Sequence, residues 1–192
     1  MKIKKGDYGY IKSQKMKRFW RTLGFFALPI AIFIVGYILN KGDRLNIYSI
    51  IAVVGCIPGC ISAVTMITMW LRKPMSEELY KEIKEICGIQ TMAYELYVTT
   101  QEASLFFDAV LFSGDSVTAY CDRTLKQDDI NLLQAHIRKS LKLEKYDANF
   151  RILDQSSKKQ FMDRIRSGRG SYKLRDHSRE EGMKETLLLL AL

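Results

Sequence analysis

Two long apolar runs near the beginning of the chain limit what it can fold into. Residues 19–39 and residues 47–71 are each close to the length of about 20 residues that crosses the hydrocarbon core of a bilayer. Arg21, near the start of the first run, is the only charged residue in either of them. A charge at the centre of a bilayer costs about 2.5 to 3.5 kcal/mol, and a soluble helix of this length would carry a polar face. The sequence therefore predicts a transmembrane helical hairpin over residues 19–72.

Small residues in the two runs predict how the spans pack. Ala27 and Ala31 lie four residues apart in the first run, and Gly55, Gly59 and Ala63 continue the same spacing in the second. Small residues on one face of a helix let two backbones approach closely. We therefore expect the two spans to contact each other through these positions. Packing between two copies of the chain is the alternative.

Basic residues gather around this hairpin and predict its orientation. Residues 1–73 contain twelve Lys and Arg against two Asp and Glu, whereas residues 74–192 contain eighteen against nineteen. Lys and Arg concentrate on the cytoplasmic side of membrane spans. The basic segment of residues 1–18 and the C-terminal part are therefore predicted to be cytoplasmic, and the loop of residues 40–46 to lie outside. The predicted location is the inner (cell) membrane, as a multi-pass protein, and a bacterial source is suggested by composition alone.

The ends of the two runs indicate what the hairpin contacts. Trp and Tyr are enriched at membrane–water interfaces, and they stand here at the inner ends, Trp20 and Trp70, and at the outer ends, Tyr37 and Tyr48. The predicted partner is the lipid bilayer, with anionic lipids beside the basic segment, at about 1 kcal/mol per basic residue. A second copy of the chain or another membrane protein is a further candidate partner. Nucleic acid is disfavoured, because the chain after the hairpin carries no excess of positive charge.

The four cysteines do not predict a metal site. Cys56 and Cys60 lie one helical turn apart in the second run, and Cys87 and Cys121 lie in the C-terminal part. None of these spacings matches a zinc site built from Cys and His. We interpret Cys56 and Cys60 as small packing residues, with metal ligation or a redox response as the alternatives. No cofactor is predicted.

Residues 75–192 alternate between helical and strand periodicity. Ser76 is suited to cap the start of a helix, and Gly168 is suited to end one. The pattern predicts an α/β (α+β) domain in the order α-β-β-β-α-β-α, followed by a C-terminal element, residues 180–192, that is either a helix or a strand. The predicted elements begin with a helix over 77–87, continue with strands over 92–99, 104–112 and 117–122, and end with a helix over 127–143, a strand over 149–153 and a helix up to 168.

The first strand of this domain has a simple alternating pattern. Alternate side chains of a strand point to opposite faces of the sheet. Met92, Tyr94, Leu96 and Val98 are therefore predicted to share one face, and Glu95 is predicted to point to the other.

Asp108 stands out in the second strand, because every neighbour in residues 105–112 is apolar. A carboxylate in such surroundings has to be paired, to bind a hydrogen-bond donor or to shift its pKa. Asp108 is thus the one candidate catalytic residue. Its alternative role is structural, as an acceptor for a neighbouring turn.

The stretch FFDAVLFSGDSVTAYCDR, together with the order helix, three strands, helix, strand, resembles the nuclease-related (NERD) domain of the restriction-endonuclease-like superfamily. In that pattern an Asp on the second strand is followed by Glu-x-Lys on the third, and the carboxylates hold a divalent cation. Asp108 matches the Asp, but Cys121 and Arg123 stand at the Glu and Lys positions. The resemblance therefore implies a nuclease-like fold with a degenerate active site, for which Asp108, Glu95 and Asp122 are the candidate metal ligands.

These features predict a membrane-anchored cytosolic α/β domain that acts as a non-catalytic protein-interaction or scaffold module. One alternative is a membrane-anchored nuclease-like or other metal-dependent hydrolase centred on Asp108. Another is an accessory subunit of a membrane transporter. Sequences typical of serine hydrolases, zinc proteases and phosphate-binding loops are absent from the chain.

Overall fold

The computed structural model describes residues 3–43, 46–100, 104–171 and 177–191. The chain forms two compact units. One is the helical segment Ile11–Lys73, and the other combines Met1–Tyr10 with Pro74–Leu192. The hairpin is thus inserted in the chain between two parts of the second unit.

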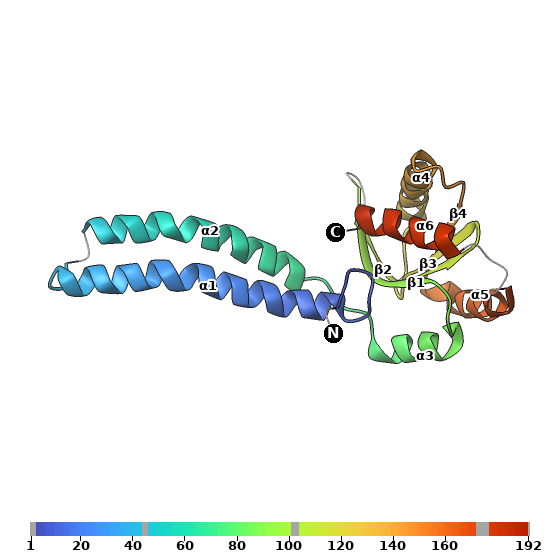
Figure 1. The fold of residues 1–192 in the computed structure, drawn as a ribbon, viewed down its shortest axis with the longest axis horizontal. Coiled ribbons are helices and arrows are strands. Elements are labelled where there is room, and N and C mark those ends of the chain that lie inside the picture. Colours follow the sequence, from blue (N-terminus) through green and yellow to red (C-terminus); the bar gives the residue numbers. More distant parts are fainter. Residues whose placement is uncertain (1–2, 44–45, 101–103, 172–176, 192) are drawn as a thin grey trace. The chain divides into compact units, whose positions relative to one another are not determined.

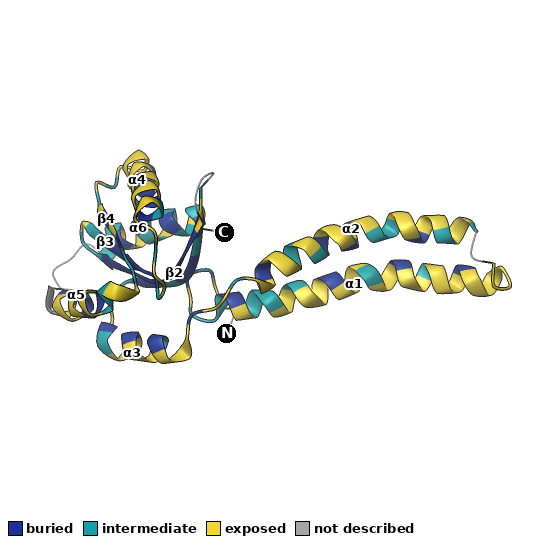
Figure 2. Ribbon diagram, turned by 180° about the vertical axis from the view of Figure 1, so that it is seen from behind, coloured by how far each residue is buried: buried dark blue, intermediate teal, exposed yellow. Residues whose placement is uncertain are grey.

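The helical unit contains two helices that are long and apolar enough to cross a membrane, α1 (Tyr10–Leu39) and α2 (Ile47–Trp70). Most of their apolar side chains are exposed (Figure 2). Asn46 caps α2, because its side chain accepts a hydrogen bond from the backbone N–H of Ser49 at 3.0 Å. The helices are antiparallel, since Lys15 of α1 donates to the carbonyl of Trp70 at the far end of α2.

The contact between α1 and α2 includes the two predicted glycines of α2 but not the two predicted alanines of α1. Gly59 lies against the ring of Phe26, and Gly55 lies against Pro29. Beside them, the hydroxyls of Thr22 and Ser62 form a buried hydrogen bond of 2.8 Å between the helices. The residues predicted to pack on the first helix, Ala27 and Ala31, are instead exposed, and Ala63 of α2 is half-buried. A four-residue spacing shows that small residues share one face of a helix, but it does not show which face contacts the other helix. In the structure the larger Phe26 and Pro29 lie opposite the glycines.

The second unit is a helix–sheet–helix domain built on one four-stranded sheet in the order β1-β2-β3-β4 (Figure 1). The first three strands are antiparallel, and β4 runs parallel to β3. The predicted order is confirmed as far as α5, and the C-terminal element is a helix, α6. In chain order the elements are α3 (Glu77–Cys87), β1 (Met92–Thr99), β2 (Ser104–Ser113), β3 (Ser116–Tyr120), α4 (Gln127–Leu143), β4 (Asn149–Leu153), a single 3-10 turn (Gln155–Ser157), α5 (Lys158–Ser171) and α6 (His177–Leu190).

Two apolar clusters hold this domain together, one on each face of the sheet. On one face α4 and α6 pack against the strands, through residues such as Leu133 and Leu187 (Figure 1). On the other face α3 and α5 pack against them, through Ile83, Phe161 and Ile165. Burial of each large apolar side chain contributes about 1.5 to 3 kcal/mol, so both helical layers are needed to stabilise the sheet.

The predicted alternation of β1 is wrong after Tyr94. Met92 and Tyr94 lie in the cluster on the α3/α5 face, whereas Leu96 and Val98 lie in the cluster on the α4/α6 face. Glu95, which separates the two pairs, has a left-handed backbone with a φ of 54°. A residue in this conformation does not continue the extended alternation of a strand, so the side chains after it change face.

Residues 3–9, which precede α1, fold onto the edge of the sheet. The backbone N–H of Tyr94 in β1 donates to the carbonyl of Gly6 at 2.8 Å. The ring of Tyr8 stacks on that of Tyr80 in α3, with 3.9 Å between the ring centroids. We call residues 3–9 the N-terminal strap. It pairs with β1 at Tyr94, on the edge of the sheet where unpaired backbone groups would otherwise be open to another chain.

The prediction that Gly168 ends its helix is wrong, because α5 continues to Ser171. Gly168 is buried, and a Cβ atom at this position would lie 2.9 Å from the side-chain nitrogen of Gln90. Gln90 itself donates from that nitrogen to the carbonyl of Ile165 at 2.9 Å. Glycine is therefore required here for close packing and not as a helix stop.

Candidate functional site

Glu95 and Asp108 lie opposite each other on the two neighbouring strands β1 and β2. The pairs Tyr94–Ala109 and Leu96–Phe107 are in register on either side of them. Both residues are buried, with 3% and 5% of their surface exposed. The face-to-face alternation is interrupted in both strands at this level, because Phe107 and Val110 also share the α4/α6 face. The alternation of side chains between the two faces of the sheet is therefore interrupted at Glu95 in β1 and at Asp108 in β2.

Each of these acids accepts a hydrogen bond from the main chain. Asp108 accepts the backbone N–H of Asp122 at 2.7 Å, where the chain leaves β3. Glu95 accepts the backbone N–H of Met75 at 3.2 Å, where the chain approaches α3. A buried N–H without an acceptor costs about 1 to 3 kcal/mol. Each carboxylate supplies the acceptor for one such backbone N–H.

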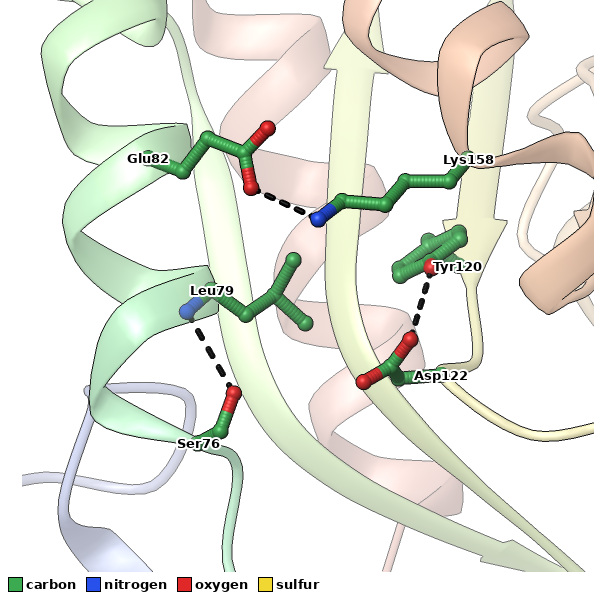
Figure 3. A network of polar contacts seen from close by, with 6 residues as sticks. All are labelled: Ser76, Leu79, Glu82, Tyr120, Asp122 and Lys158. Carbon is green, nitrogen blue, oxygen red and sulfur yellow. Dashed lines mark hydrogen bonds and ion pairs between the residues drawn. The ribbon is translucent and has the colours of Figure 1, made fainter.

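Asp122 extends this cluster toward the α3/α5 face of the sheet. Its carboxylate accepts the hydroxyl of Tyr120 at 2.9 Å (Figure 3). Tyr120 is fully buried, and its ring stacks on that of Phe161 in α5 with 5.0 Å between the centroids. In the same region Lys158 of α5 pairs with Glu82 of α3 at 2.7 Å, which joins the two helices on this face (Figure 3).

Burial is the main cause of the raised pKa of the Asp108 carboxyl. Burial and the negative charges of Asp122 and Glu95 raise the pKa of this carboxyl, whereas the bond from the Asp122 backbone and the charge of Arg123 lower it, and the net pKa is about 6. Burial likewise raises the pKa of the Tyr120 hydroxyl. A carboxyl with a pKa of about 6 is partly protonated just below neutral pH, so Asp108 can gain a proton there.

The two positions that the nuclease resemblance assigns to Glu and Lys have other surroundings. The thiol of Cys121 is buried, and burial raises its pKa to about 11, so it is neutral at pH 7. The guanidinium of Arg123 lies over the ring of Phe106, 5.5 Å from its centroid. Neither residue supplies a negatively charged ligand or a readily released proton.

The structure gives no support to a metal centre at these acids. Across the described parts of the chain, no group of three or more His, Cys, Asp or Glu side chains is arranged to hold a metal ion. Asp108, Glu95 and Asp122 lie near one another, but each carboxylate is engaged by a donor of the protein.

The residues predicted for the membrane hairpin are distributed along its surface. Trp20 and Trp70 are exposed, with 62% and 58% of their surface accessible, and lie toward the same end of the antiparallel pair. Tyr37 and Tyr48 are exposed near the opposite end, where Gly36 lies beside Tyr48. This is the placement expected of two aromatic belts.

The cysteines of α2 have different surroundings. Cys60 is exposed, and Cys56 is half-buried. Both are free thiols in the structure. Cys60 therefore does not pack against α1, and the interpretation as a packing residue applies only to Cys56.

Comparisons of this chain with family models, with curated proteins and with solved structures find no match. The function is therefore argued from the residues of this chain alone.

Sequence reasoning missed two structural features with a bearing on function. The Thr22–Ser62 hydrogen bond was signalled by hydroxyl residues within apolar helices, which often bond across a helix pair. The strap was harder to predict from the sequence. Gly6 and Tyr8 stand in a segment whose lysines indicate only the orientation of the hairpin in the membrane. Both Gly6 and Gly9 adopt a positive φ, which glycine permits and which shapes the strap as a turn.

Proposed function

We propose that this protein is a membrane-anchored interaction module. In this proposal α1 and α2 span the inner membrane as a hairpin, and the α/β domain lies at its cytoplasmic face. The domain acts there as a non-catalytic scaffold that binds another molecule. The proposal extends to both termini, which are placed in the cytoplasm, and to the short loop between the helices, which is placed outside.

One observation carries this proposal. The strap precedes the hairpin and the rest of the domain follows it, yet the two fold as one unit through the Gly6–Tyr94 and Tyr8–Tyr80 contacts. Both ends of the hairpin must therefore be on the side of the membrane that holds the domain. An even number of crossings satisfies this condition, and the two apolar helices provide it.

Charge and polarity support the same arrangement. Lys and Arg dominate the flanks of the hairpin that adjoin the domain, and basic flanks are retained in the cytoplasm. Within the helices, the polar side chains of Thr22 and Ser62 face each other, so they are satisfied without water. A helix pair with exposed apolar side chains and paired polar ones suits a hydrocarbon environment.

Labelling of single cysteines tests the topology. The four native cysteines are replaced by serine or alanine, and Asp43→Cys or Lys126→Cys is then introduced into the full chain in cells. A membrane-impermeant maleimide should label Asp43→Cys in intact spheroplasts and Lys126→Cys only after the membrane is permeabilised. The reverse pattern, or recovery of the chain in the soluble fraction, would contradict the proposal.

Purification in mild detergent tests the interaction role. The full chain, cross-linked in cells before extraction, should retain a specific partner that is lost when the surface of the α/β domain is altered. Turnover of a phosphodiester by the purified chain, abolished by Asp108→Asn, would instead support the hydrolase alternative. Co-purification only with a transporter through the hairpin would support the accessory-subunit alternative.

A further inference from the structure

Two adjoining hollows lie beside α5, on the face of the sheet that α3 and α5 cover. The smaller has a volume of about 200 Å³ and is lined by residues at the β2–β3 turn and by α5. The larger, of about 510 Å³, lies along α5 and the turn that precedes it. Arg164 and Ser167 line both, so the two hollows form one groove with Arg164 between them.

Arg164 is held in place by a buried hydroxyl. One terminal N–H of its guanidinium donates to the Thr118 side chain in β3 at 3.0 Å, and Thr118 is 2% exposed. A guanidinium carries five N–H donors in a rigid plane. Among the described residues, no carboxylate forms an ion pair with Arg164. The positive charge is therefore fixed in position by a neutral partner, and the groove supplies no described anion that neutralises it.

Hydroxyl groups surround this guanidinium in the smaller hollow. Ser113 and Ser116, at the two sides of the β2–β3 turn, line it together with Thr118. In the described part of the chain, no Asp or Glu contributes to its lining. Hydroxyls can donate to the oxygens of an anion, and each adapts its hydrogen to the geometry that the anion presents.

Further basic side chains lie around the groove. Arg151 in β4 is exposed and pairs in register with Thr118, so it lies on the same face of the sheet. Lys159 lines the larger hollow. The one acid that lines it, Asp163, pairs with Arg166 at 3.7 Å. The positive charge of the groove thus exceeds the negative charge.

We propose that this groove binds a phosphate group, with Arg164 as its principal ligand. Arginine binds phosphate through parallel N–H···O bonds, and such charge-assisted bonds are about twice as strong as neutral ones. The smaller hollow is several times the roughly 30 Å³ that a water molecule occupies in the liquid, so it admits a phosphate group. The larger hollow accommodates the rest of the molecule that carries the phosphate.

The groove is independent of the proposed membrane anchoring, because all of its residues lie in the α/β domain. Two sources could supply the phosphate: a soluble phosphorylated molecule, and the headgroup of a lipid. The chemistry at Arg164 is the same for both, and the two are separated by experiment.

Titration of the full chain in phosphatidylcholine nanodiscs with inorganic phosphate and pyrophosphate tests the proposal, at constant ionic strength. We expect saturable binding by calorimetry, weakened about tenfold or more by Arg164→Gln, since a hydrogen bond to a charged group contributes about 1.5 to 3 kcal/mol. Arg169→Gln removes the same charge on the same helix outside the lining of both hollows and should retain binding within a factor of about two.

Ser113→Asp provides a second variant, since the residue is at the rim of the groove and its replacement leaves the Arg164–Thr118 bond in place. We expect it to abolish binding by repulsion while the melting temperature is unchanged. Nanodiscs that contain phosphatidic acid distinguish the sources: if they suppress pyrophosphate binding in the wild type, the headgroup occupies the groove, and if they do not, the ligand is soluble. Absence of saturable binding to the wild type, or equal weakening by Arg164→Gln and Arg169→Gln, would overturn the proposal.

Discussion

The carboxylate of Asp108, in the middle of β2, accepts the backbone N–H of Asp122 at 2.7 Å, just beyond the end of β3. This bond replaces a main-chain acceptor at the point where the sheet loses its regular pairing. Glu95 lies opposite on β1 and accepts the backbone N–H of Met75. These two buried acids thus bind the segment that precedes α3 and the segment that follows β3.

Replacement of Asp108 by asparagine should stabilise the domain at neutral pH. Burial raises the pKa of this carboxyl to about 6, so the folded protein holds its proton more tightly than the unfolded chain. The stability contributed by this proton is present in full below the unfolded pKa of about 3.9 and is lost as the pH rises through about 6, at a cost of about 2 to 3 kcal/mol. Asparagine keeps an oxygen that accepts the Asp122 N–H but does not ionise.

The measurement is thermal unfolding of both proteins in detergent from pH 4 to pH 8. The difference in melting temperature should grow in favour of Asp108→Asn as the pH rises from about 4 to about 6, and it should level off above that range. Asp108→Ala, which removes the acceptor as well, should be destabilised at every pH. A constant difference between wild type and Asp108→Asn would show that Asp108 does not titrate in this range.

Gly59 in α2 should not tolerate even a methyl group. A Cβ atom there would lie 3.0 to 3.2 Å from three atoms of the Phe26 ring. Because the ring has to move, we expect Gly59→Ala to destabilise the helix pair by about 1 kcal/mol or more. Gly24→Ala is the matched control in α1, since nothing lies within 4 Å of its Cβ position. Equal thermal stability of the two variants in detergent would contradict the α1–α2 contact.

The Thr22–Ser62 hydrogen bond should contribute measurably to the pairing of the two helices. We expect Thr22→Val and Ser62→Ala to cost about 0.6 to 1.7 kcal/mol each, as for hydrogen bonds between membrane helices. Their effects should not add, since either substitution removes the same bond. A double-mutant cycle on unfolding in detergent measures the coupling, and a coupling energy of zero would show that the hydroxyls do not interact.

Loss of the Tyr8 ring should release the strap from the domain. Tyr8→Ala removes the stacking on Tyr80, for which about 0.5 to 1.5 kcal/mol beyond the burial of apolar area is typical. Amide hydrogen exchange of β1 should then accelerate at Tyr94, whose N–H donates to Gly6. Tyr8→Phe keeps the ring and should exchange like the wild type. Unchanged exchange in Tyr8→Ala would mean that the strap stays in place without this contact.

Regular elements could be predicted from the sequence because their signals are local. The stripe of Ile130, Leu133, Ile137 and Leu141 predicts α4 with its observed bounds, and all four side chains are buried. Ser76 caps α3 as expected, accepting the N–H of Leu79 at 3.3 Å (Figure 3). Length and the exclusion of charge likewise predict α1 and α2.

Features that depend on contacts between distant segments could not be predicted. The alternating pattern of residues 92–99 contains no sign of the left-handed backbone at Glu95. Gly168 resembles a helix stop until Gln90, from another part of the chain, is seen to approach it. Asp108 was identified correctly as unusual, but its partner, the backbone of Asp122, is invisible to side-chain patterns.

The order of synthesis gives the strap a consequence for biogenesis. Residues 3–9 leave the ribosome before the hairpin but cannot bind to β1 until that strand has been made, after the whole hairpin. In a chain that crossed the bilayer only once, the strap and β1 would be separated by the membrane, and the strand edge would stay uncovered. In the proposed topology, completion of this domain therefore depends on membrane insertion, because the strap reaches β1 only in a molecule whose two helices have both crossed the bilayer.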